Sequence, residues 1–588
     1  MRLPCAPSCA LKHLRTPLGF LRNAPRRSLH DAPQPFDAAV IGAGITGLTA
    51  AYRLSKDPSC SKVTLYEKSH HVGGWLQSET INVDGGEIVF EYGPRTLRAA
   101  APSCLPLLDL LLDLNLGDQV LFTDNSSPAS QSRYIYYPDH LVRLPTIDRK
   151  AGLISGIWNL LYPLLREPVF RTLLWSFCTE PLKDGRKSEA DESVADFVSR
   201  RLSPEVADNL VSSMFHGIFG GDIDRLSATA VMYIYRELEK RDERVMMSFL
   251  QAQRAGKQYI QTNDLLALVP IIEEKSNAHT KLLSRLVENN STLTLKKGVG
   301  QLADALLAEL KRSRKVEVLA DSEVKSIHQN PDTSNLRIED GNGHSRVHSR
   351  LIATNSPADL ANQLRRGLPE DAKVPQDTLS MLETNNYAVT MMVVNLYYPN
   401  PHLLPIRGFG YLIPRSVPFE ENPERALGVI FASETGQGQD SAPGTKLTVM
   451  MGGHWWDGWK ESDYPDHDTA VHMAQSLLKR HLNITDSPTV ARTRLQRDAI
   501  PQPTVGHIGR LNKLSRSIKN DFMNRITLAG AWYALGGTGV VDSVRQAYIA
   551  TAFGLGSKFS EDLKKGGGII RPPTLWGRSS LDFLSRYF

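Results

Sequence analysis

Three glycines in VIGAGITG (residues 40–47) have the spacing of a phosphate-binding turn. Gly42 permits a tight turn after a strand, Gly44 lets the backbone approach a pyrophosphate, and Gly47 lets the following helix pack closely on the sheet. The pyrophosphate would lie at the helix N-terminus, where free N–H groups and the helix dipole favour an anion. Glu67 closes the next apolar run, roughly 20 residues later, where a carboxylate binds ribose hydroxyls. The sequence therefore predicts a dinucleotide site.

The elements that must position this site are a strand, a helix and a second strand. Residues 37–68 run apolar, glycine-rich, helical and apolar again, which predicts a βαβ unit and an α/β fold. Near the other end of the chain, ITLAGAWYALGGTGVVDSVRQAYIATAFGL predicts a strand, a glycine loop and a long helix. Between them, VTMMVVNLYY, GFGYLIP and LTVMMGG predict a sheet of their own.

Composition limits the class of protein. A chain of 588 residues is too long for one ordinary core, so two or three lobes are expected. With 41% hydrophobic and 22% charged residues and no long apolar run, the chain is typical of a soluble or peripherally bound protein. A net charge of +5 gives no indication of nucleic-acid binding. The five cysteines have no metal-ligand spacing, so neither a metal site nor a disulfide framework is expected.

Three segments have unusual compositions. The first thirty residues contain six Lys and Arg residues and no acid, which is typical of a mitochondrial transit peptide, although a basic tail is the alternative. Residues 152–182 mix aromatic, apolar and basic side chains, which suits either a membrane interface or a helical subdomain packed on itself. Residues 240–288 are rich in Lys, Arg, Glu and Asn and are interpreted as a solvated insertion or mobile loop.

Two further motifs carry a resemblance to known proteins. The Gly73-Gly74 pair in KSHHVGGWLQS is similar to the R-x-G-G signature of the FAD-containing amine oxidase superfamily, and AGAWYALGGTGVVDSV resembles its closing FAD motif. Within that superfamily, the chain resembles the protoporphyrinogen oxidases in a series of blocks that occur in the same order: FEYGPRTLR, QSRYIYY, HGIFGGD, VVNLYY, GFGYLIP, LTVMMGG and IPQPTVGH.

The resemblance implies a Rossmann-like FAD-binding domain of the amine oxidase/p-hydroxybenzoate hydroxylase type, a β-rich substrate domain and a helical membrane-associated domain. It divides the chain into a transit peptide (1–33), three FAD-binding parts (34–103, 291–360 and 501–560), a helical substrate and membrane domain (104–239), a charged insertion (240–290), the β-rich domain (361–500) and a tail (561–588).

The resemblance also implies the site residues. Expected FAD contacts are Gly42, Ala43, Gly44, Ile45, Thr46, Gly47, Glu67, Lys68, Gly74, Trp75, Gly93, Pro94, Arg95, Thr96, Val324, Gly530, Gly539, Val540 and Val541. For the substrate, Arg133 is expected to bind a propionate, because a guanidinium matches a carboxylate in two parallel hydrogen bonds. Phe409, Leu412 and Met450 are expected apolar wall positions, and Gly217 is expected to face the macrocycle. His216 is a candidate proton acceptor or a structural histidine.

The activity that the resemblance implies is the oxygen-dependent oxidation of protoporphyrinogen IX in haem synthesis, with hydrogen peroxide as by-product. It further implies a peripheral protein of the mitochondrial inner membrane, a homodimer, and ferrochelatase as a partner, with no nucleic acid bound. A flavin-dependent amine or polyamine oxidase of the same fold is the alternative enzyme, and a non-catalytic FAD-stabilised scaffold or porphyrin carrier is the alternative from another class.

Overall fold

A five-stranded parallel sheet forms the centre of the first half of the molecule. The computed structural model describes residues 35–145, 162–183, 190–241, 244–254, 257–368, 375–554 and 574–577. The strand order is β11 (Val316–Leu319), β2 (Cys60–Tyr66), β1 (Phe36–Ile41), β15 (Arg350–Ala353) and β21 (Ile526–Leu528), and every neighbouring pair is parallel. Helix α2 (Ile45–Lys56) connects β1 to β2, so the predicted βαβ unit is confirmed.

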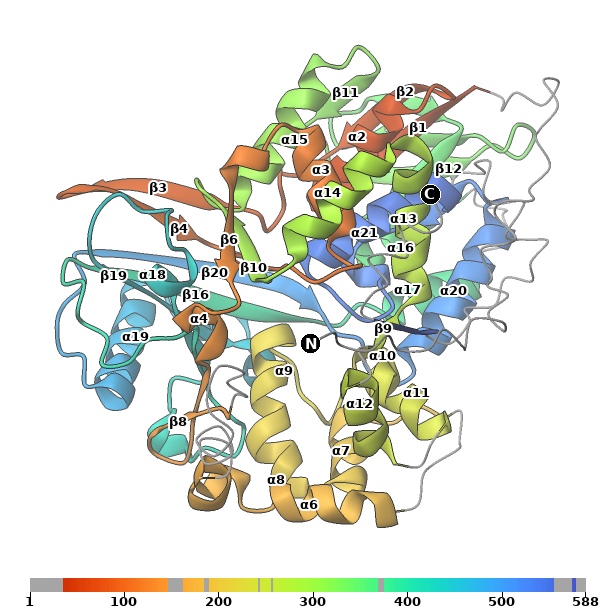
Figure 1. Ribbon diagram of the computed structural model, residues 1–588. Helices are drawn as coiled ribbons and strands as arrows, with labels where there is room; N and C mark the ends of the chain where they lie inside the picture. Colours follow the sequence, from red (N-terminus) through yellow and green to blue (C-terminus); the bar gives the residue numbers. More distant parts are fainter. Residues whose placement is uncertain are drawn as a thin grey trace, which may run out of the picture.

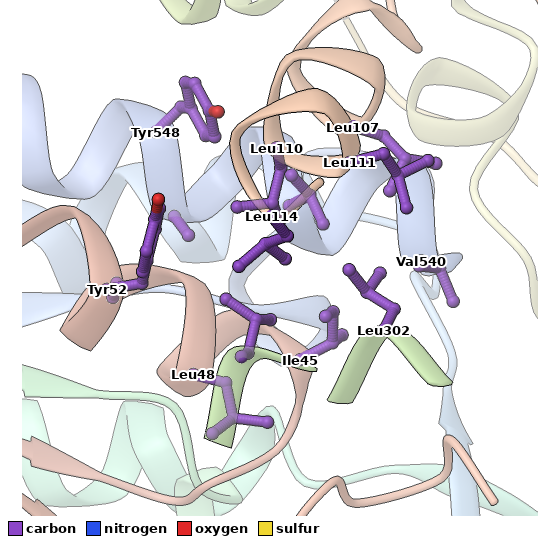
Figure 2. Close-up of a cluster of buried hydrophobic side chains, with 14 of the residues drawn as sticks. Ile45, Leu48, Tyr52, Leu107, Leu110, Leu111, Leu114, Leu302, Val540 and Tyr548 are labelled. Atoms are coloured by element: carbon purple, nitrogen blue, oxygen red, sulfur yellow. The ribbon is translucent and has the colours of Figure 1, made fainter. Parts of the chain in front are cut away.

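The two faces of this sheet bury two separate cores, because successive residues of a strand point to opposite faces. Ala38 and Val40 of β1 belong to the core shared with α2, α3 (Leu105–Asp113), α15 (Gly300–Arg312) and α21 (Val540–Ile549). Leucines of α3, with Leu48 and Leu302, fill this core (Figure 2). Ala39 and Ile41 face the other core, which contains β12 (Val324–Gln329), β13 (Leu336–Asp340), α16 (Pro357–Arg366), α17 (Gln376–Thr384) and α20 (His507–Asp521).

A seven-stranded sheet forms the second half of the molecule, as the segments VTMMVVNLYY, GFGYLIP and LTVMMGG predict. Its order is β20 (Val490–Pro501), β16 (Ala388–Tyr398), β19 (Thr445–Gly452), β18 (Ala426–Phe431), β17 (Gly410–Leu412), β7 (Tyr134–Tyr136) and β8 (Leu141–Arg143). Val394 and Leu396 point to the face that α19 (His467–Leu482) covers. Val393 and Asn395 point to the other face, where Asn395 Nδ2 donates to Glu91 O at 2.8 Å. That face therefore meets the first half of the molecule.

A helical part lies at the end of the molecule opposite to α2 and β1 (Figure 1). Its main elements are α6 (Leu173–Thr179), α7 (Val194–Arg201), α8 (Pro204–Val206), α9 (Ser212–Phe219), α10 (Ala228–Val231), α11 (Tyr233–Arg241) and α12 (Val245–Arg254). Phe197, Phe215 and Phe219 are buried in its core. Helix α9 also contacts β17 and β18, which joins the helical part to the seven-stranded sheet.

The interpretation of residues 240–288 as a solvated insertion or loop is wrong. Helices α13 (Thr262–Glu274) and α14 (Asn277–Val287) bury apolar side chains in the same core as α2 and α3, including Ala267, Ile271 and Leu283. Polar contacts hold the two helices in place: Arg545 of α21 pairs with Asp264, and His279 contacts Asp109 at 2.7 Å. The charged residues of the segment occupy the outer faces of helices whose inner faces are apolar.

The expected boundary at residue 104 also needs correction. Helix α3 packs on α21 and α13 rather than in the helical part, and β7 and β8 belong to the seven-stranded sheet. The remaining strands form smaller sheets: β3 (Ser78–Val83) pairs with β4 (Gly86–Glu91), and β10 (Asn290–Leu295) lies between β5 (Leu97–Arg98) and β6 (Val120–Asp124). β14 (Ser345–His348) extends the β12–β13 pair. β9 (Lys257–Ile260) pairs with β22 (Thr574–Gly577). The transit peptide, residues 152–161 and most of the tail lie outside the described residues.

Candidate active site

The glycine turn has the backbone geometry that its spacing predicts. Gly42 adopts φ +93°, which favours glycine, and its N–H donates to Tyr66 O at 2.8 Å. A Cβ on Gly47 would lie 1.9 Å from Gly42 O, so α2 approaches the turn too closely for any side chain. A Cβ on Gly44 would meet no protein atom within 4 Å. Helix α2 begins at this open position without a side-chain cap, which leaves N–H groups of its first turn for an anion.

Glu67 lies at the end of β2 and holds the turn from the side. Its Oε2 accepts a hydrogen bond from the Ala43 N–H at 2.8 Å, and its Oε1 accepts one from the Ser69 N–H at 2.9 Å. The backbone of Glu67 accepts from the Ser322 N–H at 2.8 Å, which brings the start of β12, with Val324, beside it. Lys68 points away: it is exposed and lies 3.4 Å from Asp359.

The second glycine pair contacts the first turn directly. The Gly73 N–H donates to Ala43 O at 2.9 Å, and a Cβ on Gly74 would lie 3.1 Å from Gly44 Cα. Trp75, the residue after this glycine pair, lies against Gly93: a Cβ on Gly93 would lie 2.0 Å from Trp75 O. Residues 73–75 thus pack between the phosphate turn and the segment that contains Gly93, Pro94, Arg95 and Thr96.

The C-terminal glycine loop reaches the same place. Gly530, with φ +101°, lies against Thr46, whose Oγ1 would be 3.3 Å from a Cβ on Gly530. Gly539 precedes α21, which also begins without a side-chain cap. The side chain of Val540 is buried in the core with that of Ile45 (Figure 2), so only the backbone of these two residues is free for a cofactor. Val541 is partly buried against the same core.

Arg95 and Glu91 lie close enough to affect each other's pKa, where the two halves of the molecule meet. Burial lowers the pKa of Arg95 to about 10, against the effect of Glu91, and the guanidinium therefore stays charged at neutral pH. Burial raises the pKa of Glu91 to about 7, although hydrogen bonds from Ser78 and the Val299 N–H oppose the increase. Arg95 Nη1 is buried and has no hydrogen-bond partner in the described chain. A buried donor without a partner is costly, so this atom marks a place for a ligand acceptor.

The expected substrate residues come together on one face of the seven-stranded sheet. Leu412 pairs with Gly428, which in turn pairs with Met450, so their side chains share a face. A Cβ on Gly217 would lie 2.8 Å from Leu412 Cδ2, which places α9 against this surface. Met214 lies one helical turn before Gly217 and Ile218 on α9, so the three residues share one face of the helix. The exposed side chains of Met214 and Ile218 therefore extend the surface formed by Leu412 and Met450. We call this surface the apolar wall: Met214, Gly217, Ile218, Leu412 and Met450.

Arg133 supplies a cation beside the apolar wall. Its guanidinium carbon lies 5.6 Å from the centre of the Phe409 ring, and the Phe409 N–H donates to Ser132 O at 2.9 Å. Arg133 directly precedes β7, and its carbonyl accepts from the Leu144 N–H, which continues the β7–β8 pairing. Side chains alternate along a strand, so Arg133 points to the same side as Ile135, the register partner of Leu412. Desolvation and the nearby Arg98 both lower the pKa of Arg133. The sequence prediction named Arg133 and Phe409 but missed Arg98, Met214 and Ile218.

His216 is a structural residue. It is 2% exposed, its Nδ1 donates to Ile413 O at 2.7 Å, and its Nε2 lies 2.9 Å from His454 Nε2. Because a carbonyl only accepts, Nδ1 carries the proton and Nε2 accepts from His454. Burial and the neighbouring His454 lower the pKa of His216 to about 3. Both ring nitrogens are used within the protein, so the imidazole remains neutral and has no lone pair left for a substrate proton.

Sequence similarity decides the family. The profile described as flavin containing amine oxidoreductase matches residues 45–552. A protoporphyrinogen oxidase of Schizosaccharomyces pombe is 32% identical over 84% of this chain and 94% of that protein. The chain belongs to the protoporphyrinogen oxidase family of flavin-containing amine oxidoreductases.

Other members of the protoporphyrinogen oxidase family agree. The human protoporphyrinogen oxidase is 31% identical over 87% of this chain and 97% of its own length. A crystal structure from Exiguobacterium sp. 255-15 has the same fold, with a TM-score of 0.62 and 19% identity over 91% of this chain and 99% of that one. Like its family, the chain is an FAD-dependent oxidoreductase.

The residues of this protoporphyrinogen oxidase family member fit FAD. The open position above Gly44 and the uncapped start of α2 are connected through residues 73–75 to the segment of Arg95, whose Nη1 has no partner in the described chain. Helix α21, which also begins without a side-chain cap, packs on α2. Donors at two helix N-termini and a buried guanidinium suit a ligand with a pyrophosphate and a polar ring edge. Among the described residues, no three His, Cys, Asp or Glu side chains are grouped so that they could hold a metal ion.

Proposed function

We propose that this protein catalyses the oxygen-dependent oxidation of protoporphyrinogen IX to protoporphyrin IX, with hydrogen peroxide as by-product. The observation that carries the proposal is the placement of Arg133 and Phe409 beside the apolar wall, on the sheet face that meets the cofactor-binding half. Protoporphyrinogen IX is an apolar macrocycle with two propionates. The apolar wall, with the cationic Arg133 at its edge, matches that distribution of charge. The curated relatives are named protoporphyrinogen oxidases, which favours this reaction over amine oxidation.

The protein contributes position rather than acid–base chemistry. Bound FAD would supply the two-electron acceptor chemistry, with O2 as the final oxidant, and three such oxidations would remove six hydrogens from the macrocycle. Arg133 fixes the propionate edge by a charge-assisted hydrogen bond, while Leu412 and Met450 exclude water from the ring. His216 is neutral and fully engaged, so no proton transfer is assigned to it. The reaction therefore depends on how the wall orients the macrocycle.

Replacing Arg133 with alanine is expected to raise the KM for protoporphyrinogen IX about 10- to 100-fold, because a hydrogen bond to a charged group contributes roughly 1.5–3 kcal/mol. FAD content should stay unchanged, since Arg133 directly precedes β7 of the seven-stranded sheet and lies outside the glycine loops. The measurement is porphyrin fluorescence during aerobic turnover, with flavin absorbance as the record of loading.

Arg143→Ala is the matched control. Arg143 belongs to β8 and pairs with Tyr134 of β7, the residue after Arg133. Its side chain therefore points to the sheet face opposite to that of Arg133. It should leave KM within a factor of two. An Arg133→Ala protein with the parent's KM would remove Arg133 from the site, and a parent protein that does not oxidise protoporphyrinogen IX would contradict the proposed reaction.

We also infer peripheral association with the mitochondrial inner membrane. In support, the first thirty residues have a transit-peptide composition, and the helical part exposes large apolar side chains, including Leu165 at 74%, Trp175 at 73% and Leu182 at 84%. Exposed aromatic and apolar residues suit the membrane interface. Within the described residues, no helix is both long and apolar enough to cross a bilayer. A homodimer and ferrochelatase as partner complete the proposal, as the family resemblance suggests.

The double variant Trp175→Ser/Leu182→Ser is expected to bind anionic phospholipid vesicles at least tenfold more weakly than the parent. The reason is that a large apolar side chain that moves from water into the membrane contributes roughly 1.5–3 kcal/mol. Co-sedimentation measures the effect. Met523→Ser, at an exposed apolar residue of the α20 end, is the control and should bind like the parent. If the double variant sediments like the parent, this surface does not contact lipid.

A further inference from the structure

A second arginine, Arg98, emerges beside Arg133 from a neighbouring strand. Arg98 belongs to β5 and pairs with Thr292 of β10, and the next N–H, of Ala99, donates to Ser291 O at 3.0 Å. Ser291 Oγ in turn lies 2.5 Å from Ser130 Oγ. Ser130 belongs to α4 (Pro128–Gln131), which ends two residues before Arg133. Both arginines are therefore attached to segments that meet at Ser291.

The side chains of these two arginines are both free to reach a ligand. On β5, Leu97 is buried in the core and Arg98 is exposed, so Arg98 points away from the core. Arg133 is exposed as well, apart from its contact with the Phe409 ring. No carboxylate of the described chain lies within ion-pair distance of either guanidinium. Arg98 is also the one charged neighbour that lowers the pKa of Arg133, which places the two guanidinium groups within electrostatic reach of each other.

Two adjacent cations without a counter-charge repel each other, and an anionic ligand relieves that repulsion. A ligand with two carboxylates at one edge neutralises both guanidinium groups at once. The apolar remainder of the ligand can then lie on the apolar wall, because Leu412 of that wall pairs with Ile135 of β7, next to Arg133. A single carboxylate would leave one cation uncompensated, so the pair favours a dicarboxylate over a monocarboxylate.

We propose that Arg98 is a second anchor, which together with Arg133 binds the two carboxylates of a dicarboxylate macrocycle, one carboxylate on each arginine. The proposal rests on the proposed function and deepens it: Arg98 selects the free diacid over its esters and fixes which edge of the ring faces the arginines. Arg98 touches no reacting atom, so its role is substrate positioning and specificity.

The test is equilibrium binding of protoporphyrin IX, its monomethyl ester and its dimethyl ester to the FAD-loaded protein, followed by porphyrin fluorescence. The variants are Arg98→Gln, Arg98→Lys, Arg133→Gln and the double Arg98→Gln/Arg133→Gln, with Arg312→Gln as control because Arg312 is 76% exposed on α15. Arg98→Gln is expected to weaken diacid binding roughly 10- to 100-fold and to leave dimethyl ester binding unchanged. Arg98→Lys should recover part of the loss, since it restores the charge.

The following outcomes would overturn the proposal. Arg98→Gln could bind the diacid as tightly as the parent, or it could lose affinity equally for the diacid and the dimethyl ester, which indicates a structural role. A parent protein that does not distinguish the diacid from the dimethyl ester would also exclude a two-carboxylate anchor. If only Arg133→Gln loses diacid affinity, the second anchor fails while the proposed reaction stands. A parent that binds none of the porphyrins overturns both.

Discussion

A Gly47→Ala protein is expected to be purified without FAD and to unfold at a much lower temperature than the parent. The added Cβ would lie 1.9 Å from Gly42 O and 3.1 Å from Gly42 C, and both are backbone atoms that no rotamer change can move. Helix α2 would have to move away from β1, which opens the core of Ala38 and Leu48 and displaces the turn. Overpacking against backbone costs roughly 1–3 kcal/mol or more, and the lost cofactor removes its own stabilisation.

Gly44→Ala separates the cofactor site from the fold. Gly44 has φ −70°, which alanine adopts, and its Cβ would meet no protein atom within 4 Å. We expect a stable protein with weakened FAD binding, because the methyl group occupies the space above the turn. Gly509→Ala, in α20 and equally unobstructed, should keep FAD and gain up to about 1 kcal/mol in stability.

Flavin absorbance per protein and circular dichroism on heating measure both effects. Full FAD content in Gly47→Ala, with a melting temperature within a few degrees of the parent, would contradict the close packing of α2 on the turn. FAD retention by Gly44→Ala equal to that of the parent would contradict placement of the pyrophosphate above Gly44.

Local patterns in the sequence predicted the parts of the fold that depend on local contacts. The spacing of Gly42, Gly44 and Gly47 predicted the turn between β1 and α2, because each glycine answers to a steric demand within a few residues. The β-rich composition of VTMMVVNLYY predicted a strand, and β16 is buried along almost its whole length.

Strand neighbours and buried helices were beyond local patterns. The partners of β1 in its sheet include β15, more than 300 residues later, and nothing in either strand specifies the other. The segment 240–288 was misread because its charge content hides the apolar spacing of Ala267, Leu268 and Ile271. Window composition averages the two faces of such a helix, whereas packing depends on the apolar face alone.

The candidate site divides in the same way. The glycine loops were found because backbone requirements restrict the residue type. Arg98 was missed because a single exposed arginine carries no pattern, and its significance depends on Ser291, which joins its strand to the segment of Arg133. Ile45 and Val540 stay predicted FAD contacts through their backbone only, because their side chains are buried in the core.

A Glu239→Gln protein is expected to have a strongly destabilised helical part. Three arginines of α7 and α11 form a largely buried network with Glu180, Glu192 and Glu239, and Glu239 and Arg236 are each 1% exposed. Glu239 contacts Arg200 at 2.6 Å and Arg236 at 2.6 Å. Loss of its charge leaves three cations with two carboxylates, and removing one partner of a buried ion pair costs about 3–5 kcal/mol.

The effect of Glu239→Gln should be confined to the half of the molecule that contains the network. Helix α9, with Gly217 of the apolar wall, shares its core with α7, so we expect weaker porphyrin binding. The FAD turns belong to a different core, so flavin should be retained at low temperature. Loss of porphyrin binding on heating reports on the helical part and flavin release reports on the FAD-binding half, because a multidomain protein need not unfold in one step. Glu309→Gln, at the exposed Arg312–Glu309 pair, is the matched control and should cost less than about 1 kcal/mol. If the two Glu→Gln variants melt alike, the buried network does not stabilise the helical part, and α9 must be held against the sheet by its contacts with Leu412 and β18 alone.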